Sequence, residues 1–196
     1  IANAISEYRS GGNDVFHVRG LAGLDVFNGG DGYDKIRGGN ENDTIRVTAN
    51  QSNLNSIEKI DGGAGNGDII VATGGNDTLD FSGIAISGIE QIRLGAGNDI
   101  VLGSNGNDTF WGGTGQDTFR FQAFSGHDVI LDFGIGFLGT GGDKIDLRET
   151  PISTYADLIE NMRQSGNDTI ITLDGQNSIT LKNVPNWQLF FEHFLV

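Results

Sequence analysis

The chain has 196 residues and a formal net charge of −14, from 26 acidic and 12 basic side chains. This charge disfavours nucleic acid as a partner and favours cations. The chain has no cysteine, which excludes disulfide bonds and thiol chemistry, and no apolar run approaches the ~20 residues of a membrane span. It begins at Ile1 rather than methionine, so we expect it to be part of a longer protein.

A nine-residue block follows the leading segment 1–8 and makes up a first repeat stack, residues 9–46. An imperfect copy at 9–17 precedes three clean copies from residue 20 to 46, which read GLAGLDVFN, GGDGYDKIR and GGNENDTIR. Each clean copy has an aspartate at its sixth position, after a turn segment that carries glycine, and an apolar residue at its eighth. The last three residues of a copy predict a short strand whose middle side chain points inward.

An insertion at 47–61 leads into a second repeat stack at 62–120. This stack holds looser copies at 62–71 and 72–80, an insertion at 81–93, and three clean copies from 94 to 120. Both insertions end on similar peptides, SIEKI and GIEQI, and we expect each to add a half-buried strand and to bulge from the stack. Nine aspartates share the sixth position of a block: Asp14, Asp25, Asp34, Asp43, Asp68, Asp77, Asp99, Asp108 and Asp117.

Residues 121–196 lose the nine-residue period, and we expect them to cap the last exposed rung of the stack. The sequence predicts a helix at 154–164, just after Pro151. It also predicts strands at 169–173 and 178–181, because Asp-Gly-Gln-Asn between them is a hairpin signal. We expect Trp187 and the C-terminal phenylalanines to lie in the core of this cap.

One block cannot bury its apolar residue alone, so stacked blocks predict a parallel roll with two thin sheets and aspartate turns along both edges. If two blocks complete one coil, aspartates 18 residues apart face each other on one edge; slipped blocks pair over slightly longer distances. The predicted pairs are Asp25 with Asp43, Asp99 with Asp117, Asp14 with Asp34, and Asp108 with Asp128.

These turns predict calcium sites. Calcium prefers six to eight oxygen ligands and mixes carboxylates with backbone carbonyls, and each turn offers several carbonyls and one carboxylate. Magnesium fits these turns less well, because it requires rigid octahedral geometry. Zinc also fits poorly, because the ligand spacing of zinc sites is missing. The candidate calcium ligands are Asp14, Gly20, Asp25, Gly29, Asp31, Asp34, Gly38, Asn40, Asp43, Asp68, Asp77, Asp99, Gly103, Asn105, Asp108, Gly112, Thr114, Asp117 and Asp128.

The block resembles the Gly-Gly-x-Gly-x-Asp-x-apolar-x pattern of calcium-binding RTX proteins. Over 9–120 the chain is similar to the hemolysin-type repeats of bacterial proteins secreted by the type I route. Residues 121–196 resemble the C-terminal domain of serralysin-type proteases and alginate epimerases. The resemblance implies an all-β fold, a right-handed parallel β-roll that folds on extracellular calcium, with a β-rich cap that contains one short helix. It also implies an uncleaved C-terminal secretion signal.

The sequence has neither a zinc-protease H-E-x-x-H motif nor a G-x-S-x-G elbow. We therefore expect a non-catalytic, secreted module that folds with calcium and supports the type I secretion and stability of a larger protein. The alternative is a calcium-dependent polysaccharide-binding or adhesive module of a carbohydrate-active enzyme or an adhesin. For that alternative, Arg37, Arg46, Trp111 and Arg120 at ninth block positions are either a strip for a sugar polymer or scattered surface residues.

Overall fold

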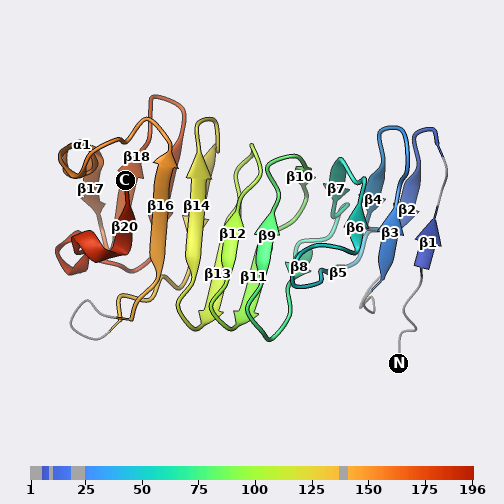
Figure 1. Ribbon diagram of the computed structural model, residues 1–196, viewed down its shortest axis with the longest axis horizontal. Helices are drawn as coiled ribbons and strands as arrows, with labels where there is room; N and C mark the ends of the chain where they lie inside the picture. Colours follow the sequence, from blue (N-terminus) through green and yellow to red (C-terminus); the bar gives the residue numbers. More distant parts are fainter. Residues whose placement is uncertain (1–5, 9–10, 19–24, 137–140) are drawn as a thin grey trace.

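The computed structural model describes residues 6–8, 11–18, 25–136 and 141–196. These residues form short strands stacked along the long axis of an elongated β-roll, and the chain runs from one end of that axis to the other (Figure 1). Almost all strand pairs are parallel, as the nine-residue block predicts; the two antiparallel pairs join β17, β18 and β19 near the C-terminus.

The N-terminal half of the roll has two small parallel sheets. One follows the order β1 (Ser6–Tyr8), β3 (Val26–Asn28), β6 (Leu54–Asn55). The other follows the order β10 (Ala85–Ser87), β7 (Lys59–Asp61), β4 (Lys35–Arg37), β2 (Val15–His17). Because these strands have only two or three residues, each contributes at most one or two side chains to the core.

The C-terminal half has two longer sheets. The eight-stranded sheet contains β5 (Thr44–Arg46), β8 (Ile69–Val71), β11 (Gln91–Ala96), β13 (Thr109–Thr114), β15 (His127–Ile130), β19 (Ser178–Leu181), β18 (Asp168–Thr172) and β17 (Met162–Ser165), in that spatial order. The five-stranded sheet contains β9 (Thr78–Asp80), β12 (Ile100–Leu102), β14 (Thr118–Gln122), β16 (Lys144–Glu149) and β20 (Phe194–Leu195). Strands from 121–196 thus continue both sheets of the roll.

All nine strands predicted from the blocks are present, and the eighth-position side chain of each is buried. These side chains are Phe16, Phe27, Ile36, Ile45, Ile70, Leu79, Val101, Phe110 and Phe119. They form one continuous core along the roll, in which the rings of Phe110 and Phe119 from facing sheets have centroids 5.8 Å apart. Burying such a side chain contributes roughly 1.5–3 kcal/mol. Because each block strand supplies one such side chain, the core is narrow along the repeats.

The coils differ in length, and the two insertions account for much of the difference. A hydrogen bond from a backbone N–H to an aspartate carboxylate joins equivalent turns of successive coils. Its two residues are 18 positions apart in the most regular coil and up to 25 apart where the insertions lie. The prediction that the insertions bulge from the roll is wrong. Residues of 47–61 form β6 and β7, and residues of 81–93 form β10 and the start of β11, all in register with their neighbours. The insertions therefore widen the coil rather than leave it.

The cap agrees with the predicted helix and hairpin. Helix α1 (Tyr155–Asn161) begins after Thr154, whose hydroxyl accepts the Asp157 N–H at 3.1 Å, a favourable N-cap. It ends before the predicted residue 164 because Met162 is extended and opens β17. Strands β18 and β19 form the predicted antiparallel hairpin.

The expectation that Trp187 and all the C-terminal phenylalanines lie in the cap core is wrong. Trp187 lies in the 3₁₀ helix η1 (Asn186–Gln188) and is 72% exposed, and Phe191, in η2 (Phe191–His193), is 71% exposed. Only Phe194 of β20 is buried there. No helix among the described residues has the length and apolar character needed to cross a membrane.

Candidate metal centre

Aspartates of successive coils are joined by hydrogen bonds along one edge of the C-terminal half. The backbone N–H of Asp77 donates to Asp99 Oδ1 at 2.7 Å, that of Asp99 to Asp117 Oδ1 at 3.0 Å, and that of Asp117 to Asp143 Oδ1 at 2.9 Å. We call these four residues the C-terminal carboxylate column. The carboxylates of Asp99, Asp117 and Asp143 each satisfy a buried backbone donor in the preceding coil, so the column holds the turns in register. The Asp77 carboxylate instead accepts the Thr73 N–H of its own turn at 2.8 Å.

Among the residues that the structure describes, the second oxygen of several aspartates has no hydrogen-bond partner. This holds for the Oδ2 atoms of Asp34, Asp68, Asp99 and Asp117, which are buried. In other turns Oδ2 accepts a backbone N–H four residues earlier, as from Ser104 to Asp108 at 2.7 Å. A buried carboxylate oxygen without a partner is costly, and a bound cation would satisfy it.

The turns beside the column bring backbone carbonyls close together. Gly113 and Gly115 have φ values of +95° and +136°, which non-glycine residues rarely adopt. A Cβ atom at either position would clash with a carbonyl oxygen of the preceding coil, that of Gly95 or Gly97. Carbonyl oxygens therefore stack at the edge where the carboxylates run, which is the mixture of ligands that calcium prefers.

Burial perturbs the column electrostatically. It raises the pKa of Asp99 to about 6 and that of Asp143 to about 6, and the neighbouring carboxylate of Asp117 raises both further. Burial also raises the pKa of Asp128, on the other edge, to about 8, with a contribution from Asp108. Ionised carboxylates at these positions need a counter-charge, so the site favours either protonation or a cation.

The profile of the RTX calcium-binding nonapeptide repeat matches the chain in four copies, within residues 19–48, 84–119 and 164–181. The chain carries RTX calcium-binding repeats. A comparison with curated protein sequences gave no match. Among solved structures, the extracellular lipase LipA from Serratia marcescens is similar, with a TM-score of 0.39 and 16% sequence identity. The match covers 97% of this chain, which spans only 40% of the lipase chain.

Three of the four predicted aspartate pairs are adjacent in the RTX roll. Besides Asp99 with Asp117, the N–H of Asp108 donates to Asp128 Oδ1 at 2.9 Å. The N–H of Asp14 likewise donates to Asp34 Oδ1 at 2.8 Å. Their adjacency was predictable from spacing, whereas calcium ligation by them stays a prediction.

The predicted pair of Asp25 with Asp43 is wrong. The insertion lengthens this coil, so β3 pairs with β6 rather than β5, and Asn53 donates to the Asp25 carbonyl at 2.9 Å. Asp43 instead has Asp68 as its neighbour and donates its N–H to Asp68 Oδ1 at 2.6 Å. A spacing of 18 residues marks neighbours only where no insertion intervenes.

The remaining predicted ligands divide by position in the RTX turn. Gly29, Gly38, Gly103 and Gly112 open their turns and lie against the carboxylate of their own block. Four others, Asp31, Asn40, Asn105 and Thr114, are exposed at the third position of their turns. Gly20 lies outside the described residues. No three His, Asp or Glu side chains gather as a metal-binding cluster in the described ranges, so any site here depends on carbonyls as well as carboxylates.

Two glutamates perform the aspartate's role where the insertions end. Glu58 Oε2 accepts the Asp34 N–H, and Glu90 Oε2 accepts the Asp68 N–H, both at 2.6 Å. Sequence reasoning treated SIEKI and GIEQI only as extra strands. Their shared glutamate, two residues before the second isoleucine, was the available signal, because a block aspartate also lies two residues before its apolar residue.

Two further aspartates were missed near the cap. Asp143 ends the carboxylate column, and Asp132 accepts the N–H groups of Gly112 and Gly113 at 2.8 Å each. Asp132 also raises the pKa of Asp117 and Asp143 by its charge, in addition to burial. In the peptide GGDKI at 141–145 an isoleucine lies two residues after the aspartate, as the apolar residue does in each block, which was the sequence signal for Asp143.

Asparagines just before the aspartates form a second ladder. The side-chain oxygen of Asn76 accepts the N–H of Asn98 at 2.8 Å, and Asn98 accepts that of Gln116 at 2.9 Å. Asn107 accepts the N–H of His127 in the same way at 2.8 Å. The recurring Asn-Asp dipeptide was visible in the sequence, and its asparagine satisfies the turn backbone next to the carboxylate.

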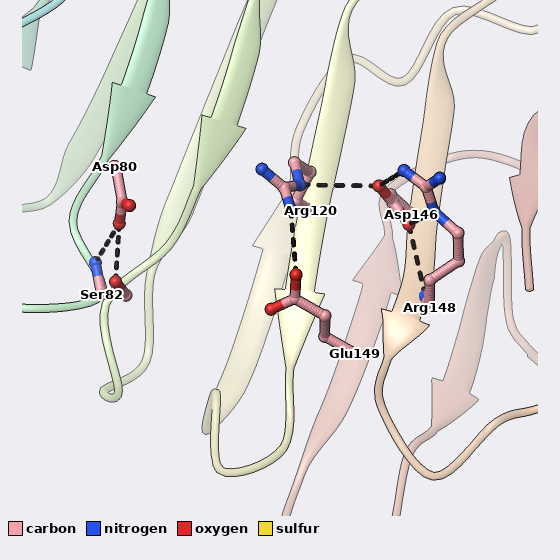
Figure 2. Close-up of polar contacts among 6 residues, drawn as sticks. All are labelled: Asp80, Ser82, Arg120, Asp146, Arg148 and Glu149. Carbon is pink, nitrogen blue, oxygen red and sulfur yellow. Dashed lines mark hydrogen bonds and ion pairs between the residues drawn. The ribbon is translucent and has the colours of Figure 1, made fainter.

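The predicted strip of ninth-position residues is not one surface. Arg37 lies on β4, Arg46 and Trp111 lie on the eight-stranded sheet, and Arg120 lies on the five-stranded sheet. Figure 2 shows that Arg120 is neutralised by two carboxylates, Asp146 at 3.5 Å and Glu149 at 3.1 Å. Arg120 is therefore unsuited to binding an anionic sugar.

Proposed function

We propose that this chain is a non-catalytic module that folds when it binds extracellular calcium and thereby stabilises a larger secreted protein. The observation that carries the proposal is the set of buried, unpartnered Oδ2 atoms within RTX turns, beside stacked backbone carbonyls. These residues fit a hard divalent cation, because every available donor is an oxygen.

The C-terminal carboxylate column is the part of the chain that we expect to hold calcium best. Asp99 and Asp117 supply carboxylates with an unpartnered oxygen, and the turns at 94–98 and 112–116 supply carbonyls. Calcium, when bound, supplies the positive charge that these stacked carboxylates lack. The chain's own contribution is to fix the oxygens, through the Asp-to-Asp and Asn-to-backbone hydrogen bonds between coils.

The narrow core explains why folding would await calcium. Most strands contribute a single core residue, and the carboxylates of neighbouring coils repel one another unless protonated or neutralised. A ligand that binds only the folded state adds its binding free energy to stability. Where calcium is scarce, as in a cytoplasm, the chain would stay unfolded and suited to export by a type I machinery that reads the C-terminus; outside the cell it would fold.

Circular dichroism of the chain tests this function. We expect little β-structure in a calcium chelator, recovery on adding calcium, and a much weaker response to magnesium at the same concentration. An equally folded chain in chelator would contradict the proposal. Type I export can be tested separately with a deletion of residues 192–196, which should abolish secretion from cells carrying such a machinery.

A further inference from the structure

One row of side chains crosses the outer face of the eight-stranded sheet. In register, Arg46 lies beside Val71, Val71 beside Arg93, and Arg93 beside Trp111. Their neighbours in each strand, such as Ile92 and Phe110, point into the core, so the row faces outward. Because neighbouring strands lie about 4.8 Å apart, the row extends roughly 14 Å along the roll.

The strands that carry this row, β5, β8, β11 and β13, contain arginine but no acidic residue, although the chain has a net charge of −14. Within the described part of the chain, Arg93 forms no ion pair, and its Nε donates to the neutral Gln91 side chain at 2.8 Å. Arg120 on the opposite sheet differs from Arg93, because Asp146 and Glu149 neutralise it (Figure 2).

Trp111 adds a large aromatic surface to the row. Its side chain is 45% exposed on a strand whose other large apolar residue, Phe110, is buried. Val71 is partly exposed between the arginines. An indole on a flat sheet offers an apolar face with a polar N–H at its edge, which suits the mixed apolar and hydroxyl surface of a sugar ring.

We propose that this row binds a linear polysaccharide that carries carboxylate groups, with one sugar stacked on Trp111 and a carboxylate bound by Arg93. The Arg guanidinium pairs with carboxylates in a bidentate geometry. Arg46 lies two strands from Arg93 in the same row. The inference rests on the proposed function, because the row exists only in the folded roll.

Charge density favours this ligand over nucleic acid. Duplex DNA carries one charge per roughly 1.7 Å, and the acidic turns along both edges of the roll would repel it. A uronate chain has at most one carboxylate per sugar. The Debye length is about 8 Å at physiological salt, so the charge of Arg93 governs binding of a narrow, sparsely charged chain more than the distant edges do.

Isothermal titration calorimetry in saturating calcium tests the proposal. The probes are a soluble oligomer of glucuronic acid, a neutral cello-oligosaccharide of equal length, and a short single-stranded DNA. We expect the uronate oligomer to bind more tightly than the other two. Trp111→Ala and Arg93→Ala should each lower its affinity about tenfold, the scale of one lost aromatic or charge-assisted contact.

Two matched variants are the controls. Trp187→Ala removes the other tryptophan, which is the more exposed of the two, and Arg120→Ala removes an arginine from the opposite sheet; both should change affinity less than about twofold. Equal binding of DNA or of the neutral oligomer, or equal losses in the controls, would overturn the inference. Circular dichroism in the same buffer separates the two proposals. A folded chain that does not bind uronate overturns this inference alone, whereas a chain unfolded in calcium overturns the proposed function first.

Discussion

The carboxylates of the two halves of the roll differ in one respect. Where an insertion follows, the backbone N–H groups of Asp34 and Asp68 donate to a glutamate of the next coil, Glu58 or Glu90. In the C-terminal carboxylate column, every position is an aspartate, and both Asp99 and Asp117 follow glycine-containing turns. Strand pairing continues through both halves, so the roll tolerates the insertions.

The comparison separates two properties of a repeat. A glutamate reaches the same backbone N–H as an aspartate and so preserves the stacking of coils. It comes without the G-x-G-x-D peptide of the regular turns at 95–99 and 113–117, however, although the Gly88 carbonyl before Glu90 still closely approaches Gly62. We infer that calcium binding depends on the regular turns, whereas the fold requires only the hydrogen-bond acceptor.

The largest effect is expected from Asp99→Ala, in the middle of the C-terminal carboxylate column. The variant removes a candidate calcium ligand and leaves the buried Asp77 N–H without its acceptor. In calcium, we expect a loss of at least about 2 kcal/mol in the free energy of unfolding and a lower calcium affinity. Urea denaturation and calcium titration measure both. Asp80→Ala, an exposed aspartate outside the turns, is the control, and an equal loss there would contradict the account.

Gly115→Ala should have the next largest effect. The added methyl would meet the Gly97 carbonyl, and φ at this position is +136°. We expect destabilisation by more than about 1 kcal/mol together with weaker calcium binding. Gly74→Ala is the matched control, because a Cβ there meets nothing within 4 Å. Similar melting temperatures for the two variants would show that the close carbonyls are unimportant.

The pH dependence should have opposite signs with and without calcium. Asp99, Asp128 and Asp143 have folded pKa values of about 6, 8 and 6, above the ordinary 3.8. Between pH 4 and 8, roughly, the folded state binds more protons than the unfolded state, so calcium-free stability falls as pH rises.

In chelator, we therefore expect β-structure to increase as the pH is lowered from 8 towards 5. In limiting calcium, acid should instead weaken folding, because protons compete for the same carboxylates. Circular dichroism across pH in both buffers measures the two trends. Identical trends in both would contradict carboxylate ligation.

The smallest effect is expected from Glu90→Gln. Glutamine keeps an oxygen that can accept the Asp68 N–H, so only the charge of this hydrogen bond is lost. We expect a change of about 1 kcal/mol or less in stability and no change in the number of calcium ions bound. Loss of a bound ion would show that the glutamate positions are also calcium sites, and the distinction between the two halves would fail.

Much of the roll followed from the nine-residue pattern, because period and local chemistry agree at each block. The burial of Phe110 and Phe119 could be predicted, because the middle residue of a three-residue strand is the one whose side chain points inward. The partner of Asp25 could not be predicted. The path of the insertion sets the length of this coil, and Asn53 does not lie in a recognisable nine-residue block. Glu58 was also missed, because it accepts the Asp34 N–H with a longer side chain and the peptide before it does not match the glycine-rich turn of the blocks.

The RTX profile also matches a segment that does not form a parallel coil. It matches 164–181, yet there Asp168 lies in an antiparallel hairpin, and its carboxylate binds Lys182 and the Asn183 N–H. A Gly-Asn-Asp-Thr peptide therefore gives a stacked carboxylate only when a parallel neighbour supplies the N–H. Tertiary context decides this, and one copy of the motif does not contain it.

Hydrogen exchange at the amides of Asp77, Asp99 and Asp117 tests the central claim most directly, because each donates to the carboxylate of the next coil. The account predicts strong protection of all three in calcium and rapid exchange in chelator at neutral pH. Equal protection of these amides in both buffers would show that the carboxylate column forms without calcium and would contradict calcium-coupled folding.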